Sequence, residues 1–195
     1  MPEIDTAAEL PETAQLDLIR TELAECEKRR PDVFALARVA SLARSIEPEL
    51  LRTLRMELKL SAGDMPVTVA AESGLWFSDF VESRGADGIT LLPEALQVLR
   101  PRVKADSTLL DDARKIIETA HESAPGVLRW EERLVYLALA GKQTELQEQV
   151  LRGIGSIRDG TRLPLANWIA DMWPRLPPEA ATHPLMAKLH EMPLE

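Results

Sequence analysis

The 195-residue chain is poor in aromatic side chains, which make up 4% of it. A hydrophobic core must therefore be filled by Leu, Ala, Ile and Val. This favours packed helices over a β-sandwich, whose strands depend on aromatic and β-branched residues. Cysteine is scarcer still, because Cys26 is the only one. A single cysteine excludes an internal disulfide, and we expect a cytoplasmic protein.

Positive charge is in deficit, since 32 acidic side chains outnumber 23 Lys and Arg residues and give a formal net charge of −9. Such a surface repels nucleic-acid phosphates and acidic membranes unless the basic residues are segregated. No apolar run approaches the roughly 18 residues of a membrane span. The N-terminal stretch Met1–Leu10 is acidic and lacks the apolar core of a signal peptide. We expect no membrane segment and no direct binding to nucleic acid.

The sequence motifs of common catalytic and metal sites are also missing. Gly153 and Gly155 form a G-x-G inside a helical pattern, which indicates local packing or a bend rather than a phosphate loop. His183 and His190 are seven residues apart, not the three or four that direct two ligands at one metal. Together with His121 at a predicted helix end, they are interpreted as ordinary surface histidines. We predict no catalytic residue, no cofactor and no metal.

Paired acidic residues are the remaining candidates for chemistry. Glu131 and Glu132 have the side chains needed for acid–base catalysis, but they stand at a predicted helix start, where negative charge is favourable in itself. A solvated helix start is therefore the simpler interpretation, and Asp111 and Asp112 receive the same one. Cys26 falls on the apolar stripe of the first predicted helix with no histidine beside it, which indicates a buried, inert thiol.

Helical periodicity dominates the rest of the chain, because apolar residues recur at three- and four-residue spacing between prolines, glycines and capping residues. This pattern predicts helices over residues 12–29, 33–45, 48–59, 93–103, 108–122, 129–140, 144–158, 164–173 and 178–190. Pro101 predicts a kink or an early stop in the helix that begins at Pro93. Gly141 predicts the end of the helix over residues 129–140.

We therefore predict an all-α fold, either a helical bundle or a short stack of helical hairpins, with eight to ten helices. Residues 1–10 are expected to form a flexible acidic arm. Residues 11–195 are expected to form a single helical domain, and the pattern leaves open two subdomains that meet near residue 105.

The stretch Ser61–Leu92 is the irregular part of this fold, because it contains four glycines and an internal proline. We expect short helical turns over Thr68–Ser73 and Trp76–Glu82. A loop over Ser83–Gly88 and a short extended segment from Ile89 to Leu92 are expected to follow.

The same stretch gathers three of the chain's seven Trp and Phe residues into five positions, namely Trp76, Phe77 and Phe80. Large aromatic side chains are usually buried, so one interpretation is a core plug that anchors the irregular connection. The other interpretation is a recognition patch, with Glu82 and Arg84 at its polar end. We take Trp76, Phe77, Glu82 and Arg84 as candidate partner-binding residues.

A second candidate surface is the basic side of the helix that begins at Pro48, where Arg52, Arg55 and Lys59 lie together. Phosphate binding is one interpretation. A solvated face flanked by glutamates is the other, and no aromatic residue supplies the stacking half of a single-strand binding surface. Arg52 and Arg55 are kept as candidate contacts to a protein partner.

The string LWFSDFVESRGADGITL, Leu75–Leu91, resembles a module at the front of bacterial multidomain proteins. The strings LLRTLRMEL (Leu50–Leu58), RWEERLVYLAL (Arg129–Leu139) and WPRLPPE (Trp173–Glu179) are looser similarities to it. In those proteins the module is joined to a formylglycine-generating-enzyme-like domain, a NACHT-type NTPase or a caspase-like peptidase. The resemblance covers Val33–Glu179 and implies a component of bacterial conflict or antiphage signalling. It carries over no catalytic residue, and the missing effector domain leaves two alternatives, a stand-alone version and an excised piece.

These observations predict a non-catalytic adaptor or effector-associated module that binds a protein partner, such as a caspase-like peptidase or an NTPase of the same antiviral defence pathway. The alternative is a transcription-linked regulator, either a sigma-factor binder or a helix-turn-helix protein. For DNA contact a basic recognition helix would be expected. A hydrolase with dispersed carboxylates is a third class, with the least support in the sequence.

Overall fold

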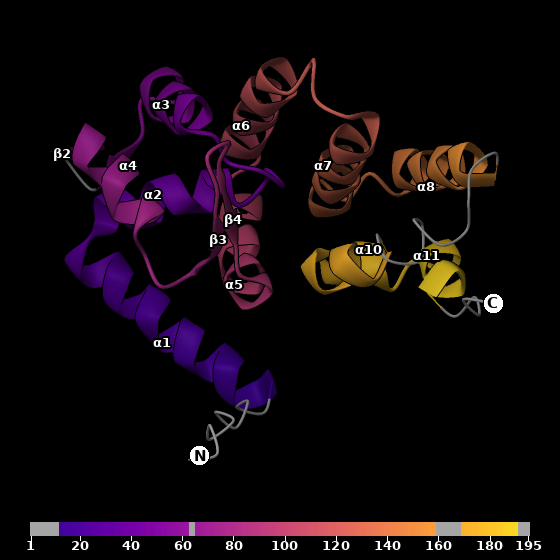
Figure 1. The fold of residues 1–195 in the computed structure, drawn as a ribbon, viewed down its shortest axis with the longest axis horizontal. Helices are drawn as coiled ribbons and strands as arrows, with labels where there is room; N and C mark the ends of the chain where they lie inside the picture. The colour runs from indigo at the N-terminus through magenta and orange to yellow at the C-terminus, as the bar shows by residue number, and fades with distance from the viewer. Residues whose placement is uncertain (1–11, 63–64, 159–168, 191–195) are drawn as a thin grey trace, which may run out of the picture.

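The computed structural model describes residues 12–62, 65–158 and 169–190, and this part of the chain is mostly helical (Figure 1). The all-α prediction is therefore confirmed. The named helices are α1 (Glu12–Arg29), α2 (Pro31–Ala40), α3 (Pro48–Glu57), α4 (Val69–Trp76), α5 (Pro93–Lys104), α6 (Ser107–Ala120), α7 (Gly126–Leu139), α8 (Gln143–Arg158), the 3-10 turn η1 (Trp173–Arg175), α10 (Pro178–Ala181) and α11 (Pro184–His190). Two antiparallel hairpins pair β1 (Ser61–Ala62) with β2 (Met65–Pro66) and β3 (Val81–Arg84) with β4 (Ile89–Leu91).

Local sequence explains several helix ends. Helices α2, α3 and α5 each begin with a proline, whose fixed φ and missing N–H suit the first helical position. The Asp106 carboxylate caps α6 by accepting the N–H of Leu109 at 3.0 Å. Gly141 ends α7 with φ +69°, a left-handed conformation that glycine adopts without strain, as predicted.

Pro101 does not stop α5, which continues to Lys104. The early stop is therefore not observed. Pro101 lies in the last turns of the helix, so only one intrahelical bond is removed, and the N–H of Ala105 still bonds to the Pro101 carbonyl at 3.3 Å.

The irregular middle differs from the prediction in several elements, since β1 and β2 form a hairpin that was not predicted and α4 runs without a break through Gly74. Helix α4 ends at Trp76, and Val81–Arg84 is a strand rather than part of a helical turn. The extended segment from Ile89 is confirmed, because β4 pairs with β3 and also with Ile46, whose N–H and carbonyl both bond to Ile89 at 3.0 Å. A Cβ at Gly88 would lie 3.0 Å from the Ile46 carbonyl oxygen, so this close approach favours a glycine.

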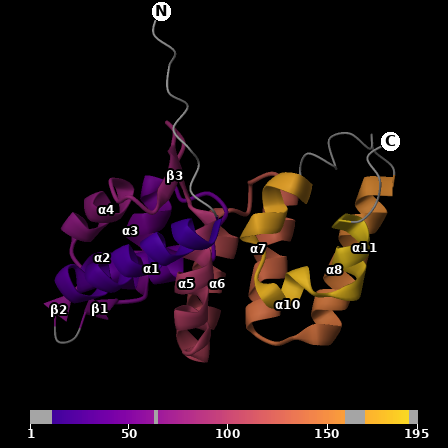
Figure 2. The ribbon, with the colours of Figure 1, turned by 90° about the horizontal axis from the view of Figure 1, so that it is seen from below.

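The ribbon gathers into two groups, α1–α6 and α7–α11, with residues 121–125 between them (Figure 1). In the first group, α1 and α2 lie beside α5, while α7 and α8 form a hairpin in the second, with α10 and α11 against them (Figure 2). The buried apolar residues form one continuous cluster that includes members of both groups. Two subdomains meeting near residue 105 stay a prediction. The predicted arm over residues 1–10 and the helix start at Pro164 lie outside the described residues.

Candidate functional site

The outer face of α4 carries the most exposed aromatic side chain. Phe77, directly after α4, is 75% exposed, and Val69 at the start of the helix is 62% exposed. Trp76 is half-buried and packs against the core. Leu75 on the opposite face of the helix is fully buried. An apolar surface therefore remains open along α4 and the residue that follows it.

The three aromatic residues of this segment thus have different roles. Phe80 is buried and belongs to the core, as the plug interpretation requires. Phe77 faces solvent, as the recognition interpretation requires. Trp76 lies between the two, because one part of the indole packs on the core.

The polar end of the segment is engaged within the chain. The Arg84 guanidinium donates hydrogen bonds to the carbonyls of Trp76 and Ser78, both at 2.7 Å, at the C-terminal end of α4. Cationic groups stabilise this end of a helix. The Glu82 carboxylate forms an ion pair with Arg175 of η1. Arg84 and Glu82 therefore position α4 and the β3–β4 hairpin, and each keeps an exposed portion at the surface.

The basic side of α3 contains one arginine that is paired within the chain and one that is exposed. The Nε atom of Arg55 lies 2.6 Å from a carboxylate oxygen of Glu72, and both side chains are largely buried. This ion pair joins α3 to α4. Arg52, one turn earlier, is exposed, and among the described residues it forms no ion pair. The structure thus brings Arg55 to the flank of the apolar α4 face, and Arg52 lies one turn earlier on the exposed surface of α3.

The interpretation of His121, Glu131 and Glu132 as solvated surface residues is wrong. Their exposed fractions are 5%, 6% and 8%. They lie where the last turn of α6 meets the first turns of α7, and the fold closes over them. One sequence signal points to this burial, because Glu131 is in helical phase with Leu134, Val135 and Ala138 on the core side of α7.

His121 is held between two carboxylates. Its Nδ1 atom lies 2.9 Å from both oxygens of Glu132, and its Nε2 atom lies 2.9 Å from Glu47. The hydrogen bond with Glu132, reinforced by that with Glu47, raises the pKa of His121 to about 9 against the opposing effect of burial. Burial alone would raise the pKa of Glu47, but the hydrogen bond from His121 helps to bring it below its ordinary value. At neutral pH the imidazolium donates from both nitrogens and has no lone pair for a metal or for general-base catalysis.

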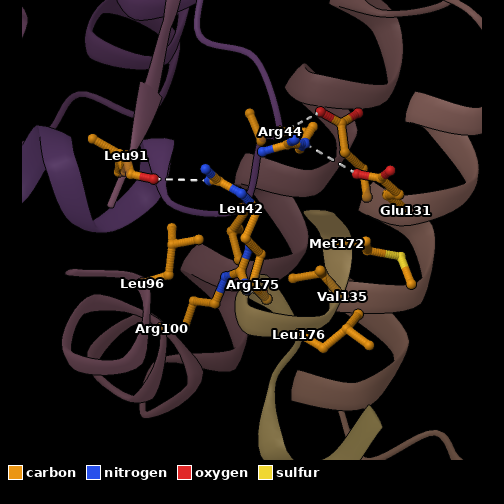
Figure 3. Close-up of a pocket in the computed structure, with 12 residues that line it drawn as sticks. Leu42, Arg44, Leu91, Leu96, Arg100, Glu131, Val135, Met172, Arg175 and Leu176 are labelled. Atoms are coloured by element: carbon orange, nitrogen blue, oxygen red, sulfur yellow. Dashed lines mark hydrogen bonds and ion pairs between the residues drawn. The ribbon is translucent and has the colours of Figure 1, made fainter. Parts of the chain in front are cut away.

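Three arginines converge on the junction of the two helix groups (Figure 3). Arg44 pairs with Glu131 at 3.3 Å. Arg175 donates to the Leu91 carbonyl at 2.9 Å, and Arg100 donates to the Ser41 carbonyl at 3.0 Å. Burial, then the charges of the other two arginines, lower the pKa of Arg100 to about 9.

The cavity among these arginines measures about 20 Å³. That is room for about one water molecule, whereas pockets for small-molecule ligands usually measure several hundred Å³. The arginines satisfy backbone carbonyls and carboxylates where the two groups pack together. This charged cluster therefore joins the two helix groups.

The other residues considered for chemistry are ordinary parts of the helices. Asp111 accepts a hydrogen bond from the Tyr136 hydroxyl at 2.8 Å, and Asp112 pairs with Lys115. Cys26 is half-buried, and burial raises the pKa of its thiol. His183 is half-buried as well. The side chain of His190 and those of Gly153–Arg158 lie outside the described part of the structure.

A long hollow follows the contact between α3 and α6. Two adjoining parts of it measure about 550 and 440 Å³ and share the lining residues Glu57, Lys115 and Ile116. Apolar side chains line it together with five carboxylates, which are Glu47, Glu49, Glu57, Asp106 and Asp112. We call this hollow the acidic groove.

A comparison with protein-family models, with curated proteins and with solved structures finds no match to this chain. Within the described residues, no helix is long and apolar enough to cross a bilayer. The same residues contain no group of three His, Cys, Asp or Glu side chains arranged to hold a metal ion.

Proposed function

We propose that this chain is a non-catalytic protein-binding module whose partner docks on the exposed face of α4. The exposure of Phe77 carries the proposal, because at 75% it exceeds that of every other large apolar side chain among the described residues. Aromatic residues at the centre of an interface commonly supply much of the binding free energy. Trp76 and Val69 lie roughly 20° apart in the helical projection and extend the apolar area on one side of Phe77.

The resemblance of Leu75–Leu91 to modules of bacterial conflict proteins supports the choice of pathway. Its aromatic residues include Phe77, the most exposed of them. We therefore propose an adaptor or effector-associated role in a bacterial defence or signalling system, with a caspase-like peptidase or an NTPase as the partner class.

The connectivity of the first helix group favours a second candidate, the helix-turn-helix regulator. Three helices, α2, α3 and α4, are followed by the β3–β4 hairpin, and Ile46 between α2 and α3 pairs with the inner strand of that hairpin. Winged helix-turn-helix units have this order, and α4 would occupy the place of their recognition helix. Here the connection between α3 and α4 is longer than the usual turn and contains the β1–β2 hairpin.

The charges of α4 and of the turn between β3 and β4 argue for protein rather than DNA. The α4 sequence, VAAESGLW, contains one glutamate and neither Lys nor Arg. The turn between β3 and β4, Gly85–Gly88, adds an aspartate and no cation. A helix that enters the major groove needs cations for the phosphates and polar side chains for the base edges. We infer that the unit uses its α4 face for protein binding.

The test is affinity capture from the host that encodes the chain, with wild-type protein and two variants as bait. Phe77→Ser removes the exposed ring, and Val127→Ser removes a half-exposed apolar side chain at the start of α7 as a matched control. Proteins captured by the wild type and by Val127→Ser should be lost with Phe77→Ser. Truncating a central contact costs about 2 kcal/mol, or roughly a thirtyfold loss of affinity.

Two outcomes would contradict the proposal. Equal capture by Phe77→Ser and wild type would mean that α4 is not the docking face. Binding of labelled duplex DNA at physiological salt, weakened by the Ser73→Glu substitution on the same helix face, would support the regulator instead. Thermal unfolding of all variants by circular dichroism serves as the check that the fold is intact.

A further inference from the structure

The acidic groove and the α4 face are complementary in shape and in charge. The groove is concave, and Leu50, Leu58, Leu109 and Ile116 contribute its apolar lining. The α4 face is a projecting helix whose exposed residues are mostly apolar. An amphipathic helix that places its apolar face in a hydrophobic groove is a recurring mode of protein recognition.

The groove has an excess of negative charge. Its five carboxylates are opposed by Lys115 and the His121 imidazolium only. Glu49 and Glu57 are exposed, and among the described residues neither forms an ion pair. Both therefore remain available to a cationic partner.

Arginines lie at the borders of the α4 face, although the chain as a whole is strongly acidic, and Arg30 among them is paired with Asp32. Arg52 lies on the α3 side of the face. On the other side, the Nη2 atom of Arg30 lies 3.5 Å from the Ala70 carbonyl oxygen, so the guanidinium lies beside the helix. Arg84 adds a cation at the C-terminal end of α4.

We propose that the α4 face of one copy of this chain docks in the acidic groove of another copy. Phe77 would lie against the apolar lining of the groove, and Arg52 would approach the exposed Glu49 and Glu57. The occupant is a second copy because the described surface offers on one chain both an apolar helix face with a cationic border and an acidic groove of matching character. This inference rests on the proposed role of α4 as a docking face and adds a second copy of the chain to the partners of that face.

The positions of the two surfaces determine the kind of assembly. Helices α4 and α6 flank α3, so the α4 face and the groove lie on different sides of that helix (Figure 1). Arg52 and Glu57 are five residues apart, which places them roughly 140° apart around an α-helix. Because the two surfaces are offset around α3, we expect head-to-tail association, in which the groove of each copy holds the α4 face of the next. The assembly grows with concentration into rings or open chains.

The test uses the full chain and two charge-reversal variants at exposed positions. Arg52→Glu alters the α4 border and keeps the groove, whereas Glu57→Lys alters the groove and keeps the α4 border. Analytical ultracentrifugation of the wild type should show a mass that rises above the 21.7 kDa of one chain as the concentration increases from micromolar to about 1 mM, the range of weak protein contacts. Added salt should reverse this rise.

The decisive measurement is the mass of an equimolar mixture of the two variants. Each variant alone should stay at 21.7 kDa, whereas the mass of an equimolar mixture should rise above that value, because one variant supplies the intact groove and the other the intact α4 face. A wild type that stays monomeric over the whole range would overturn the inference. So would a wild type that associates while the mixture stays monomeric. In either case, loss of the captured host protein with Phe77→Ser would still support the proposed function.

Discussion

The buried His121 makes the stability of this protein depend on pH in a range where few other side chains titrate. Its imidazolium is bonded to Glu132 and Glu47, and these bonds raise its pKa from the ordinary 6.5 to about 9. A group with a raised pKa in the folded state binds its proton more tightly there than in the unfolded chain. The stabilisation is therefore complete below about pH 6.5 and is lost as the pH rises through 9.

The size of the effect follows from the two pKa values. At about 1.4 kcal/mol for each pH unit, the difference between 6.5 and about 9 corresponds to roughly 3 kcal/mol of unfolding free energy. Typical domains have 5–15 kcal/mol in total, so this is a substantial fraction. Most of it should disappear between about pH 6 and pH 9.5.

The assay is urea denaturation followed by circular dichroism at constant ionic strength across that pH range. For the wild type we expect the free energy of unfolding to fall by at most about 3 kcal/mol. His121→Gln removes this titrating group, so its free energy of unfolding should be lower than that of the wild type at pH 6 and should fall less as the pH rises. His183→Gln, which alters a histidine outside the network, should retain the wild-type slope.

A wild-type stability that does not change between pH 6 and pH 9.5 would refute the reasoning. An equal slope in His121→Gln would do so as well, since another group would then be responsible. The second result would not contradict the ion pairs of His121 with Glu132 and Glu47. It would show only that they do not cause the pH dependence.

Three further predictions concern the packing around α4 and the end of α7, each measured by urea denaturation at neutral pH. Leu75→Ala should lower the free energy of unfolding by about 2–5 kcal/mol because Leu75 is fully buried, whereas Phe77→Ser should change it by less than about 1 kcal/mol; equal costs would contradict the exposed placement of Phe77. Gly74→Ala should cost about 1–3 kcal/mol, since its Cβ would lie 2.6 Å from a methyl group of the buried Val33, and an unchanged midpoint would show that α2 and α4 are less tightly packed. Gly141→Ala meets no neighbouring atom and should cost about 1 kcal/mol through its left-handed φ of +69° alone; a larger loss would mean that this turn carries additional contacts.

Local patterns were sufficient for most of the fold. Apolar residues at helical spacing predicted the helices, prolines predicted the starts of α3 and α5, and Gly141 predicted the end of α7. The extended segment at Ile89 was also predicted. These features depend on interactions between residues a few positions apart, which the sequence displays directly.

The β3 strand could not be predicted in the same way. Val81–Arg84 becomes a strand because β4 lies beside it, and β4 is fixed in turn by its pairing with Ile46, some forty residues earlier. The burial of Glu131 and Glu132 has a similar origin. A glutamate at a helix start is solvated unless a cation from elsewhere in the chain neutralises it. Here Arg44 pairs with Glu131 and His121 pairs with Glu132, and both cations come from other elements.

The sequence predicted one part of the candidate site, and the tertiary structure determined the rest. The sequence alone identified the segment around Trp76 as unusual by the crowding of its aromatic residues. Only the tertiary structure decided that Phe80 fills the core, that Phe77 remains exposed and that Arg84 binds backbone carbonyls of the same segment. The physical reason is that periodicity determines which residues share a face of a helix, whereas the neighbours that cover that face come from distant parts of the chain.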